Sequence, residues 1–175
     1  KPNILFVQLE GFMDPMSIDK VMYSKDPIPN FRKLQKNGIS GKMKTPSIGG
    51  GTARTEFEVM TGLDLEFLTD GEVPHYTILG HETLNSVAST LKKQGYSTHA
   101  IHNNQGNFYN RNKAYSSLGY DTYTSVEYMD NVERTETNWA KDTVLTKYIK
   151  ECLKSVFIQV SEYSVLVTVV NDGST

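Results

Sequence analysis

The feature that most constrains the fold of this chain is an alternation of short apolar runs with amphipathic helical stretches. The run from Asn3 to Leu9 is nearly continuous in apolar residues and has the length of a strand. Such a run is typical of a parallel strand buried on both faces of a sheet. Strands that alternate with helices of about ten to fifteen residues indicate βαβ units. The sequence therefore predicts an α/β fold with a mostly parallel sheet flanked by helices.

Hydrophobic periodicity, together with glycine and proline at the breaks, sets the limits of the predicted elements. The predicted strands cover residues 3–9, 39–45, 96–102, 120–126, 155–160 and 164–170. The predicted helices cover residues 29–38, 52–61, 82–94, 108–118 and 139–153. Residues 64–81 show no clear period and are expected to form an irregular loop. No repeat or linker interrupts the chain, so residues 1–175 are interpreted as belonging to one domain.

Composition limits the classes of partner. The 175 residues suit a single core, and 18 Lys and Arg face 20 Asp and Glu, so nothing indicates nucleic acid as a partner. The single cysteine, Cys152, excludes an internal disulfide and is expected to be a small core residue of the last helix. No apolar run has the length of a membrane span, so contact with a membrane is expected only through flanking segments.

Strands are predicted close to both ends of the chain. The sequence begins at Lys1, rather than at methionine, and enters a strand at once; it ends at residues 171–175 directly after another. We therefore expect flanking sequence beyond both ends and a fold that is incomplete on its C-terminal side.

Three successive glycines, residues 49–51, precede Thr52 and a helical pattern. Glycine lets the backbone turn sharply and approach a ligand closely. Free N–H groups and the helix dipole favour an anion at such a helix start. The alternative is that Thr52 is only an N-cap, with Thr55 or Glu56 completing a capping box.

Other polar residues follow predicted strands, where open α/β sheets bind ligands. Glu10 follows the first strand, and His102 ends the strand 96–102. With Thr52, they are expected to meet at the carboxyl edge of the sheet. A carboxylate and a hydroxyl there suit a divalent metal that activates the hydroxyl, while His102 and the nearby Arg111 suit a phosphate.

Each of these residues also has a structural interpretation. Glu10 would be a solvated loop residue, and His102 a satisfied polar residue. Arg111 would be a solvated helix charge and Tyr109 a packing residue. Other catalytic and nucleotide-binding motifs do not match the sequence. Residues 38–42 lack the spacing of a P-loop. No dinucleotide fingerprint or serine nucleophile elbow is present.

Three blocks occur in an order that resembles the extracellular catalytic domain of lipoteichoic acid synthase and its relatives. These are phosphoglycerol transferases of the sulfatase and alkaline-phosphatase-like superfamily. The blocks are Asn-Ile-Leu-Phe-Val-Gln-Leu-Glu-Gly (3–11), Gly-Gly-Thr-Ala-Arg-Thr-Glu-Phe (50–57) and Ile-His-Asn-Asn-Gln-Gly-Asn-Phe-Tyr-Asn-Arg (101–111). The Leu-Gly-Tyr-Asp stretch at 118–121 also fits. The resemblance implies an alkaline-phosphatase-like fold, a bacterial membrane-anchored parent protein and a site on the extracellular face.

The resemblance also implies roles for particular residues. Glu10 and Thr52 look like ligands of Mn²⁺ or Mg²⁺, and Thr52 looks like the nucleophile. His102, Tyr109 and Arg111 look like the residues that contact the substrate. The implied reaction moves a glycerophosphate group from a phosphatidylglycerol-type lipid, through a threonine-linked intermediate, to a lipoteichoic-acid-like glycerol-phosphate polymer. Threonine in place of the cysteine or serine of true sulfatases disfavours sulfate ester hydrolysis; phosphoethanolamine stays an alternative donor group.

The chain departs from the family pattern downstream. The family completes its metal site with an Asp-His pair that this sequence does not contain, and Asp172 stands where the family has a histidine. With two ligands a divalent ion would be held weakly. Two hypotheses stay open: part of a metal-dependent phosphoglycerol transferase that is inactive by itself, or a non-catalytic sulfatase-fold remnant that binds an anionic head group or polymer.

Overall fold

The computed structural model describes residues 2–47, 50–154 and 164–171; for residue 10 and residues 164–171 the description covers the backbone. The chain divides into two compact units. The larger unit contains residues 1–11 and 46–175, and the smaller one contains residues 12–45. All the predicted site residues belong to the larger unit.

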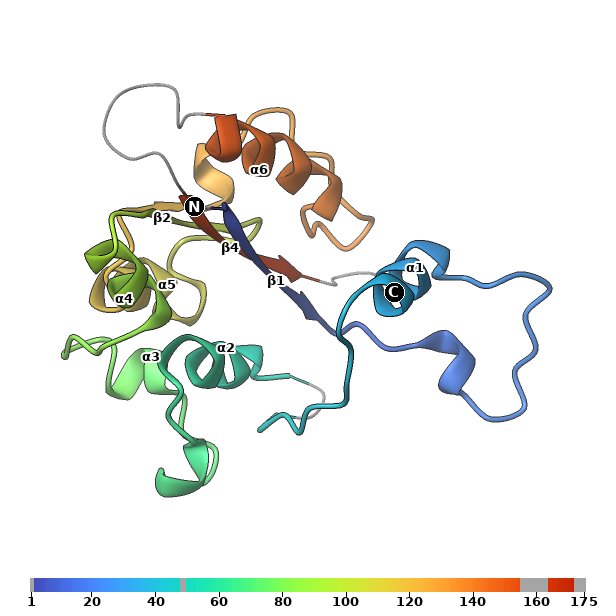
Figure 1. Ribbon diagram of the computed structural model, residues 1–175, viewed down its shortest axis with the longest axis horizontal. Helices are drawn as coiled ribbons and strands as arrows, with labels where there is room; N and C mark the ends of the chain where they lie inside the picture. The colour runs from blue at the N-terminus through green and yellow to red at the C-terminus, as the bar shows by residue number, and fades with distance from the viewer. Residues whose placement is uncertain (1, 48–49, 155–163, 172–175) are drawn as a thin grey trace. The chain divides into compact units, whose positions relative to one another are not determined.

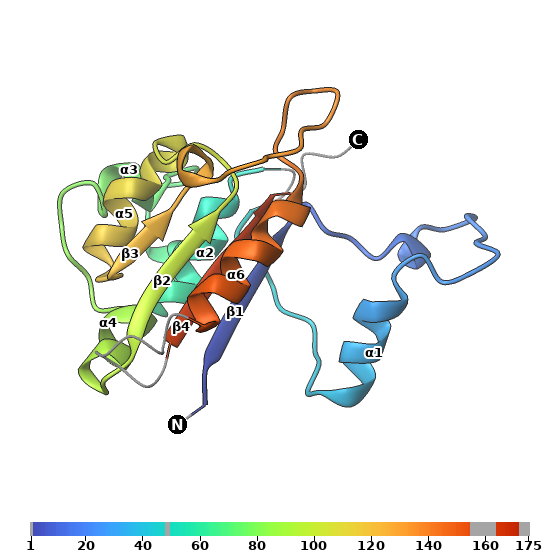
Figure 2. The ribbon, with the colours of Figure 1, turned by 90° about the horizontal axis from the view of Figure 1, so that it is seen from above.

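Parallel strands form the sheet of the larger unit, in the spatial order β1-β4-β2-β3 (Figures 1 and 2). Their bounds are Ile4–Glu10 (β1), Ser97–His102 (β2), Thr122–Thr124 (β3) and Ser164–Asn171 (β4). In the register, Glu10 lies opposite Asn171, and His102 lies opposite Val169. The backbones of Glu10 and His102 therefore reach the same carboxyl edge, separated by one strand. The predicted strand 155–160 lies outside the described residues.

Helices cover both faces of this sheet (Figures 1 and 2). One face carries α6, which contacts β2 and β4. The helices gathered on the other face are α2 (Thr52–Thr61), α3 (Pro74–Thr77), α4 (Val87–Lys93) and α5 (Arg111–Ser117), while α6 spans Leu145–Lys154.

Short 3-10 helices add single turns at Pro15–Ser17, Leu65–Phe67, Phe108–Asn110, Val126–Tyr128 and Asp142–Val144. None of the described helices has the length and apolarity that a membrane span requires.

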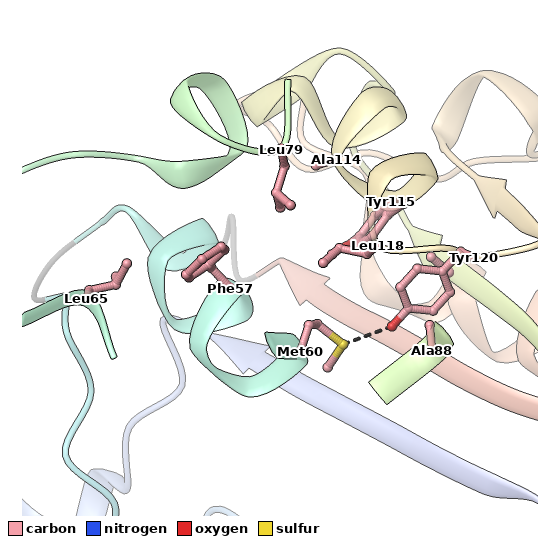
Figure 3. Close-up of a cluster of buried hydrophobic side chains, with 10 residues drawn as sticks. Phe57, Met60, Leu65, Leu79, Ala88, Ala114, Tyr115, Leu118 and Tyr120 are labelled. Atoms are coloured by element: carbon pink, nitrogen blue, oxygen red, sulfur yellow. Dashed lines mark hydrogen bonds between the residues drawn. The ribbon is translucent and has the colours of Figure 1, made fainter. Parts of the chain in front are cut away.

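Each helical layer packs on its own apolar cluster. The cluster under α2, α4 and α5 is closed by a hydrogen bond of 2.8 Å from the Tyr120 hydroxyl to the Met60 sulfur (Figure 3). Its buried members are Phe57, Met60, Leu65, Leu79, Ala88, Ala100, Ala114, Tyr115, Leu118 and Tyr120. On the other face, Ile101 of β2 packs with Leu145 of α6, and Cys152 lies partly buried beside them. Burial raises the pKa of the Cys152 thiol, as expected of a core residue.

The expectation that the first strand is buried on both faces is wrong for this structure. Leu5, Val7 and Leu9 are 45%, 47% and 39% exposed. The reason is the place of β1 at the edge of the described sheet, whereas α6 lies over β2 and β4.

In the smaller unit, the predicted helix 29–38 is confirmed as α1, Pro29–Asn37. The predicted strand 39–45 is wrong, since these residues are exposed and form no strand. A run that alternates apolar and polar residues needs a partner strand to satisfy its backbone groups. Ile39, fully exposed, packs against nothing that would favour such pairing.

Three predicted helices begin later than their apolar patterns suggest. The segment 82–94 becomes helical at Val87, because Ser86 and Ser89 form a capping box there. The segment 108–118 is broken at Tyr109 and Asn110, whose φ angles are 53° and 54°, before α5 starts. The segment 139–153 is helical from Leu145, after a single 3-10 turn.

Candidate active site

Thr52 is the first residue of α2. Gly51 occupies the N-cap position with φ 73°, and no side chain caps the helix. The interpretation of Thr52 as an N-cap is therefore wrong, because the left-handed backbone that the turn requires falls on the glycine. The Gln8 side-chain amide donates to the Thr52 carbonyl at 3.3 Å, which ties the start of α2 to β1. Gln8 lies two residues before Glu10, whose side chain is outside the described residues.

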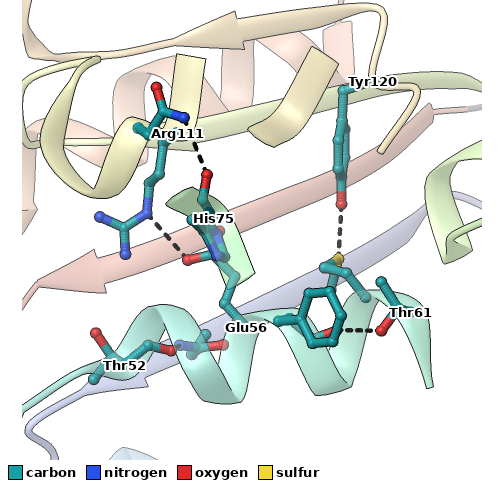
Figure 4. A network of polar contacts seen from close by, with 10 residues as sticks. Thr52, Glu56, Thr61, His75, Arg111 and Tyr120 are labelled. Atoms are coloured by element: carbon teal, nitrogen blue, oxygen red, sulfur yellow. Dashed lines mark hydrogen bonds and ion pairs between the residues drawn. The ribbon is translucent and has the colours of Figure 1, made fainter. Parts of the chain in front are cut away.

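Glu56 lies one helical turn after Thr52 and is fully buried. Its Oε2 accepts from Nε of Arg111 at 3.1 Å, and its Oε1 lies 3.1 Å from Nε2 of His75 (Figure 4). Burial alone would raise the pKa of this carboxyl, but the charge of Arg111 and then that of His75 outweigh it. They hold the pKa of Glu56 well below its ordinary value. Glu56 is therefore an ionised carboxylate inside the protein, not part of a capping box.

Arg111 is fully buried at the start of α5, so the solvated-charge interpretation is wrong. Two successive left-handed residues, Tyr109 and Asn110, turn the chain into the helix; this conformation is uncommon outside glycine. Asn110 donates from Nδ2 to the carbonyl of His75 at 3.0 Å, which connects α5 to α3. The loop geometry and the ion pair together fix where the guanidinium lies.

His102 is buried at the carboxyl end of β2. Its Nδ1 accepts from the backbone N–H of Asn104 at 3.0 Å, so a neutral ring carries its proton on Nε2. Burial, followed by the charge of Arg111, lowers the pKa of His102 to about 3. Its Nε2 has no hydrogen-bond partner in the described part of the chain. A neutral imidazole with an unsatisfied buried N–H is suited to donate to a bound oxygen.

Tyr109 is half-buried at the rim of this site. Its ring centroid lies 4.7 Å from that of Phe108 and 6.3 Å from that of Tyr76. The Arg111 guanidinium carbon lies 5.3 Å from the Tyr109 ring centroid. Tyr109 therefore packs against its neighbours and also shields the guanidinium, which is compatible with both interpretations made from the sequence.

The structure thus places Arg111 against Glu56, and the charges of both residues act on His102. Thr52 lies one turn before Glu56 on α2. Sequence reasoning missed Glu56 and His75. Thr52 and Glu56 are four residues apart in the sequence, which places both on one face of the helix. This spacing could have indicated Glu56 as a site residue. His75 lies in a segment without periodicity, and nothing local distinguishes it.

A divalent cation such as Mn²⁺ or Mg²⁺ takes several oxygen ligands. Within residues 2–47 and 50–154, no group of three or more His, Cys, Asp or Glu side chains could hold a metal ion. The Glu10 carboxylate is not among the side chains described. The described donor set does not fit such an ion, so we assign no step of the reaction to a metal.

The chain is similar to sulfatases over nearly its whole length. The family profile described as Sulfatase matches residues 2–172. The chain is 36% identical over 149 residues to a Rhizobium meliloti (strain 1021) protein named for cyclic β-1,2-glucan modification, covering 85% of this chain and 22% of that protein. It is 28% identical over 156 residues to lipoteichoic acid synthase 2 of Bacillus subtilis (strain 168), covering 88% of this chain and 24% of the synthase.

Two solved structures have a similar fold. The lipoteichoic acid synthase LtaP from Listeria monocytogenes superimposes with a TM-score of 0.79 at 23% identity. The superposition covers 97% of this chain and 40% of that one. A protein of the alkaline phosphatase superfamily from Vibrio parahaemolyticus superimposes with a TM-score of 0.76 at 18% identity, covering 100% of this chain and 41% of that one. The alkaline-phosphatase-like fold predicted from the sequence is therefore confirmed at the level of architecture. The chain spans less than a third of the two curated relatives named above, 22% and 24% of their lengths.

Proposed function

Because this chain belongs to the sulfatase family, we propose that it carries the nucleophile of a phosphoglycerol-type transferase. The observation that supports this most is the buried ion pair between Glu56 and Arg111, which holds a guanidinium near the α2 helix that starts at Thr52. Phosphoryl transfer depends mainly on positioning and on stabilising charge, and a fixed guanidinium does both.

In the proposed reaction, the Thr52 oxygen attacks the phosphorus of a phosphatidylglycerol-type lipid. The bond from phosphorus to the diacylglycerol oxygen breaks, the diacylglycerol leaves with the proton that the Thr52 hydroxyl gives up, and glycerophosphate remains on Thr52. Arg111 and the Nε2–H of His102 contact the phosphoryl oxygens, and Tyr109 borders the head group. A hydroxyl of the acceptor then attacks phosphorus, the bond from phosphorus to the Thr52 oxygen breaks, and the acceptor's proton returns to Thr52. Threonine is not the precursor of a sulfatase formylglycine, so sulfate ester hydrolysis is disfavoured.

The acceptor in this proposal is a hydroxylated polymer outside the cell. The similarity to a lipoteichoic acid synthase favours a glycerol-phosphate chain, and the similarity to a cyclic glucan modification protein favours a glucan hydroxyl. The proposed location is the outer face of a bacterial membrane.

The second candidate is a non-catalytic sulfatase-fold protein that binds an anionic head group or polymer. This candidate is favoured because, among the described side chains, no three His, Cys, Asp or Glu residues lie close enough together to hold a metal ion. Under this proposal Arg111 and His102 would still contact phosphate, but Thr52 would transfer nothing.

Metal titration distinguishes a complete catalytic site from an incomplete site or a non-catalytic protein. We expect weak or undetectable binding of Mn²⁺ and Mg²⁺ by calorimetry on the 175-residue chain, because Glu10 and Thr52 offer too few ligands. The same preparation is expected to release no diacylglycerol from phosphatidylglycerol. Tight binding that Glu10→Ala and Thr52→Ala both abolish, or measurable diacylglycerol release, would contradict this expectation and indicate a complete site. The exposed Glu66→Ala is the matched control variant for non-specific metal binding.

A further inference from the structure

His75 is a buried histidine that the proposed reaction does not use. It lies in α3, and none of its surface is exposed. A polar side chain is usually buried only where it has a polar partner. Two groups of this residue reach the surroundings of Arg111, the ring through Nε2 and the main chain through its carbonyl oxygen (Figure 4). His75 therefore acts on the site of Arg111 through two separate contacts.

The ring contact acts through Glu56. Nε2 of His75 lies 3.1 Å from Oε1 of the Glu56 carboxylate, and Nε of Arg111 donates to Oε2 of the same carboxylate at 3.1 Å. Because an ionised carboxylate only accepts, Nε2 of His75 carries the proton. A carboxylate bonded at one oxygen can still turn about its last side-chain bond, whereas one bonded at both oxygens cannot. His75 therefore fixes the plane of the carboxylate against which the planar Arg111 guanidinium lies.

The main-chain contact holds the turn that precedes Arg111. Nδ2 of Asn110 donates to the His75 carbonyl at 3.0 Å. Gly80 permits this approach, since a Cβ at that position would lie 2.8 Å from the Tyr76 carbonyl oxygen and 3.3 Å from Nδ2 of Asn110. A side chain at residue 80 would thus push α3 and Asn110 apart. The start of α5, and with it the backbone of Arg111, is therefore tied to α3.

The two contacts close a ring of interactions around Arg111, which includes its guanidinium through Glu56 and its backbone through Asn110. We propose that His75 is a positioning residue that sets the direction of the Arg111 guanidinium toward a bound phosphate, an inference that rests on the phosphate site of the proposed function. Glu56, His75 and Arg111 are all 0% exposed, and polar contacts away from water are stronger than the same contacts at the surface. A guanidinium that is held in advance loses less entropy on binding than a mobile one, so phosphate affinity depends on His75.

Binding of sn-glycerol 1-phosphate to the 175-residue chain, followed by NMR, tests this role. His75→Leu removes the ring donor but keeps the carbonyl that Asn110 contacts. We expect it to weaken binding about tenfold, the effect of losing one hydrogen bond to a charged group, and to speed the exchange of the Arg111 Nε–H with water. His75→Gln, whose amide can donate from near the position of Nε2, should restore both to within about twofold of the wild type. His81→Leu, at an exposed histidine, should change neither.

Urea unfolding of the same variants separates positioning from stability. A histidine that only stabilised the fold would lower the free energy of unfolding, while the folded variant kept its affinity and its Arg111 Nε–H exchange; that result would overturn the proposal. Asn110→Gly keeps the left-handed backbone and removes the other contact, so it serves where His75→Leu does not fold. Weaker binding with faster exchange in Asn110→Gly supports the proposal, and unchanged values of both overturn it.

The exchange measurement needs no ligand, so it also separates this inference from the proposed function. A wild-type chain that bound no glycerol phosphate would contradict the proposed function. If His75→Leu still exposed the Arg111 Nε–H in that chain and His75→Gln restored its protection, the positioning of Arg111 by His75 would stand.

Discussion

Replacing Glu56 by alanine is expected to lower the free energy of unfolding by about 3–5 kcal/mol, as is typical when one partner of a buried ion pair is removed. The Arg111 guanidinium, fully buried and 3.1 Å from the carboxylate, would lose its opposite charge, and Nε2 of His75 would lose its partner. Urea unfolding at neutral pH measures the loss. Glu66→Ala, at an exposed position, should change the same quantity by less than about 0.5 kcal/mol.

A double-mutant cycle identifies the ion pair as the cause. Glu56→Ala combined with Arg111→Ala should destabilise by clearly less than the sum of the single substitutions, because the second change removes the charge that the first left unpaired. If the two losses simply added, or if Glu56→Ala behaved like Glu66→Ala, the ion pair would not be a major determinant of stability.

The stability of the fold is expected to fall by about 2.5 kcal/mol between pH 7.5 and pH 4.5 through His102 alone, at about 1.36 kcal/mol per pH unit once protonation begins. The folded pKa of about 3 lies below the ordinary 6.5, because burial disfavours the charged ring. The unfolded chain therefore binds a proton below pH 6.5 that the folded chain does not. This stability is complete above about pH 6.5 and is lost as the pH falls toward 3.

The carboxyl groups of Glu56 and Asp121 contribute little to the pH dependence over this range. Their pKa values are also lowered, but most of their stabilising effect is lost below their ordinary values of 4.5 and 3.8. His99, whose pKa burial lowers as well, acts in the same direction as His102. Urea unfolding at several pH values should therefore show a flatter profile in His102→Gln and a smaller effect in His99→Gln. An unchanged slope in His102→Gln would contradict the assignment.

The parts of the fold that local sequence determines were predictable. The continuous apolar run of β1, the pattern of β2 and the glycines on either side of α2 gave element limits within about a residue. At Gly51 and Gly62 the structure uses φ angles of 73° and 71°, which glycine tolerates and other residues disfavour. The start of α4 was misplaced because capping by Ser86 outweighs the apolar pattern before it.

The parts that depend on distant residues were not predictable in the same way. Glu56 meets His75 and Arg111 across 19 and 55 positions of sequence, and no local pattern encodes such pairs. The left-handed backbone of Tyr109 and Asn110 likewise depends on contacts with α3, where Asn110 reaches the His75 carbonyl. Thr52, His102 and Arg111 could be proposed as site residues from the sequence, because they lie at a helix start or in an ordered motif. The partners that position Arg111 became visible only in three dimensions.

A titration with sn-glycerol 1-phosphate followed by NMR tests the proposed phosphate site most directly. We expect saturable shifts of the backbone amides at the start of α2, residues 51–54, and of the side-chain Nε–H of Arg111, while the Nε–H of Arg134 stays unchanged. Shifts at neither of the first two places, or equal shifts of both arginines, would contradict a phosphate site built from Thr52 and Arg111.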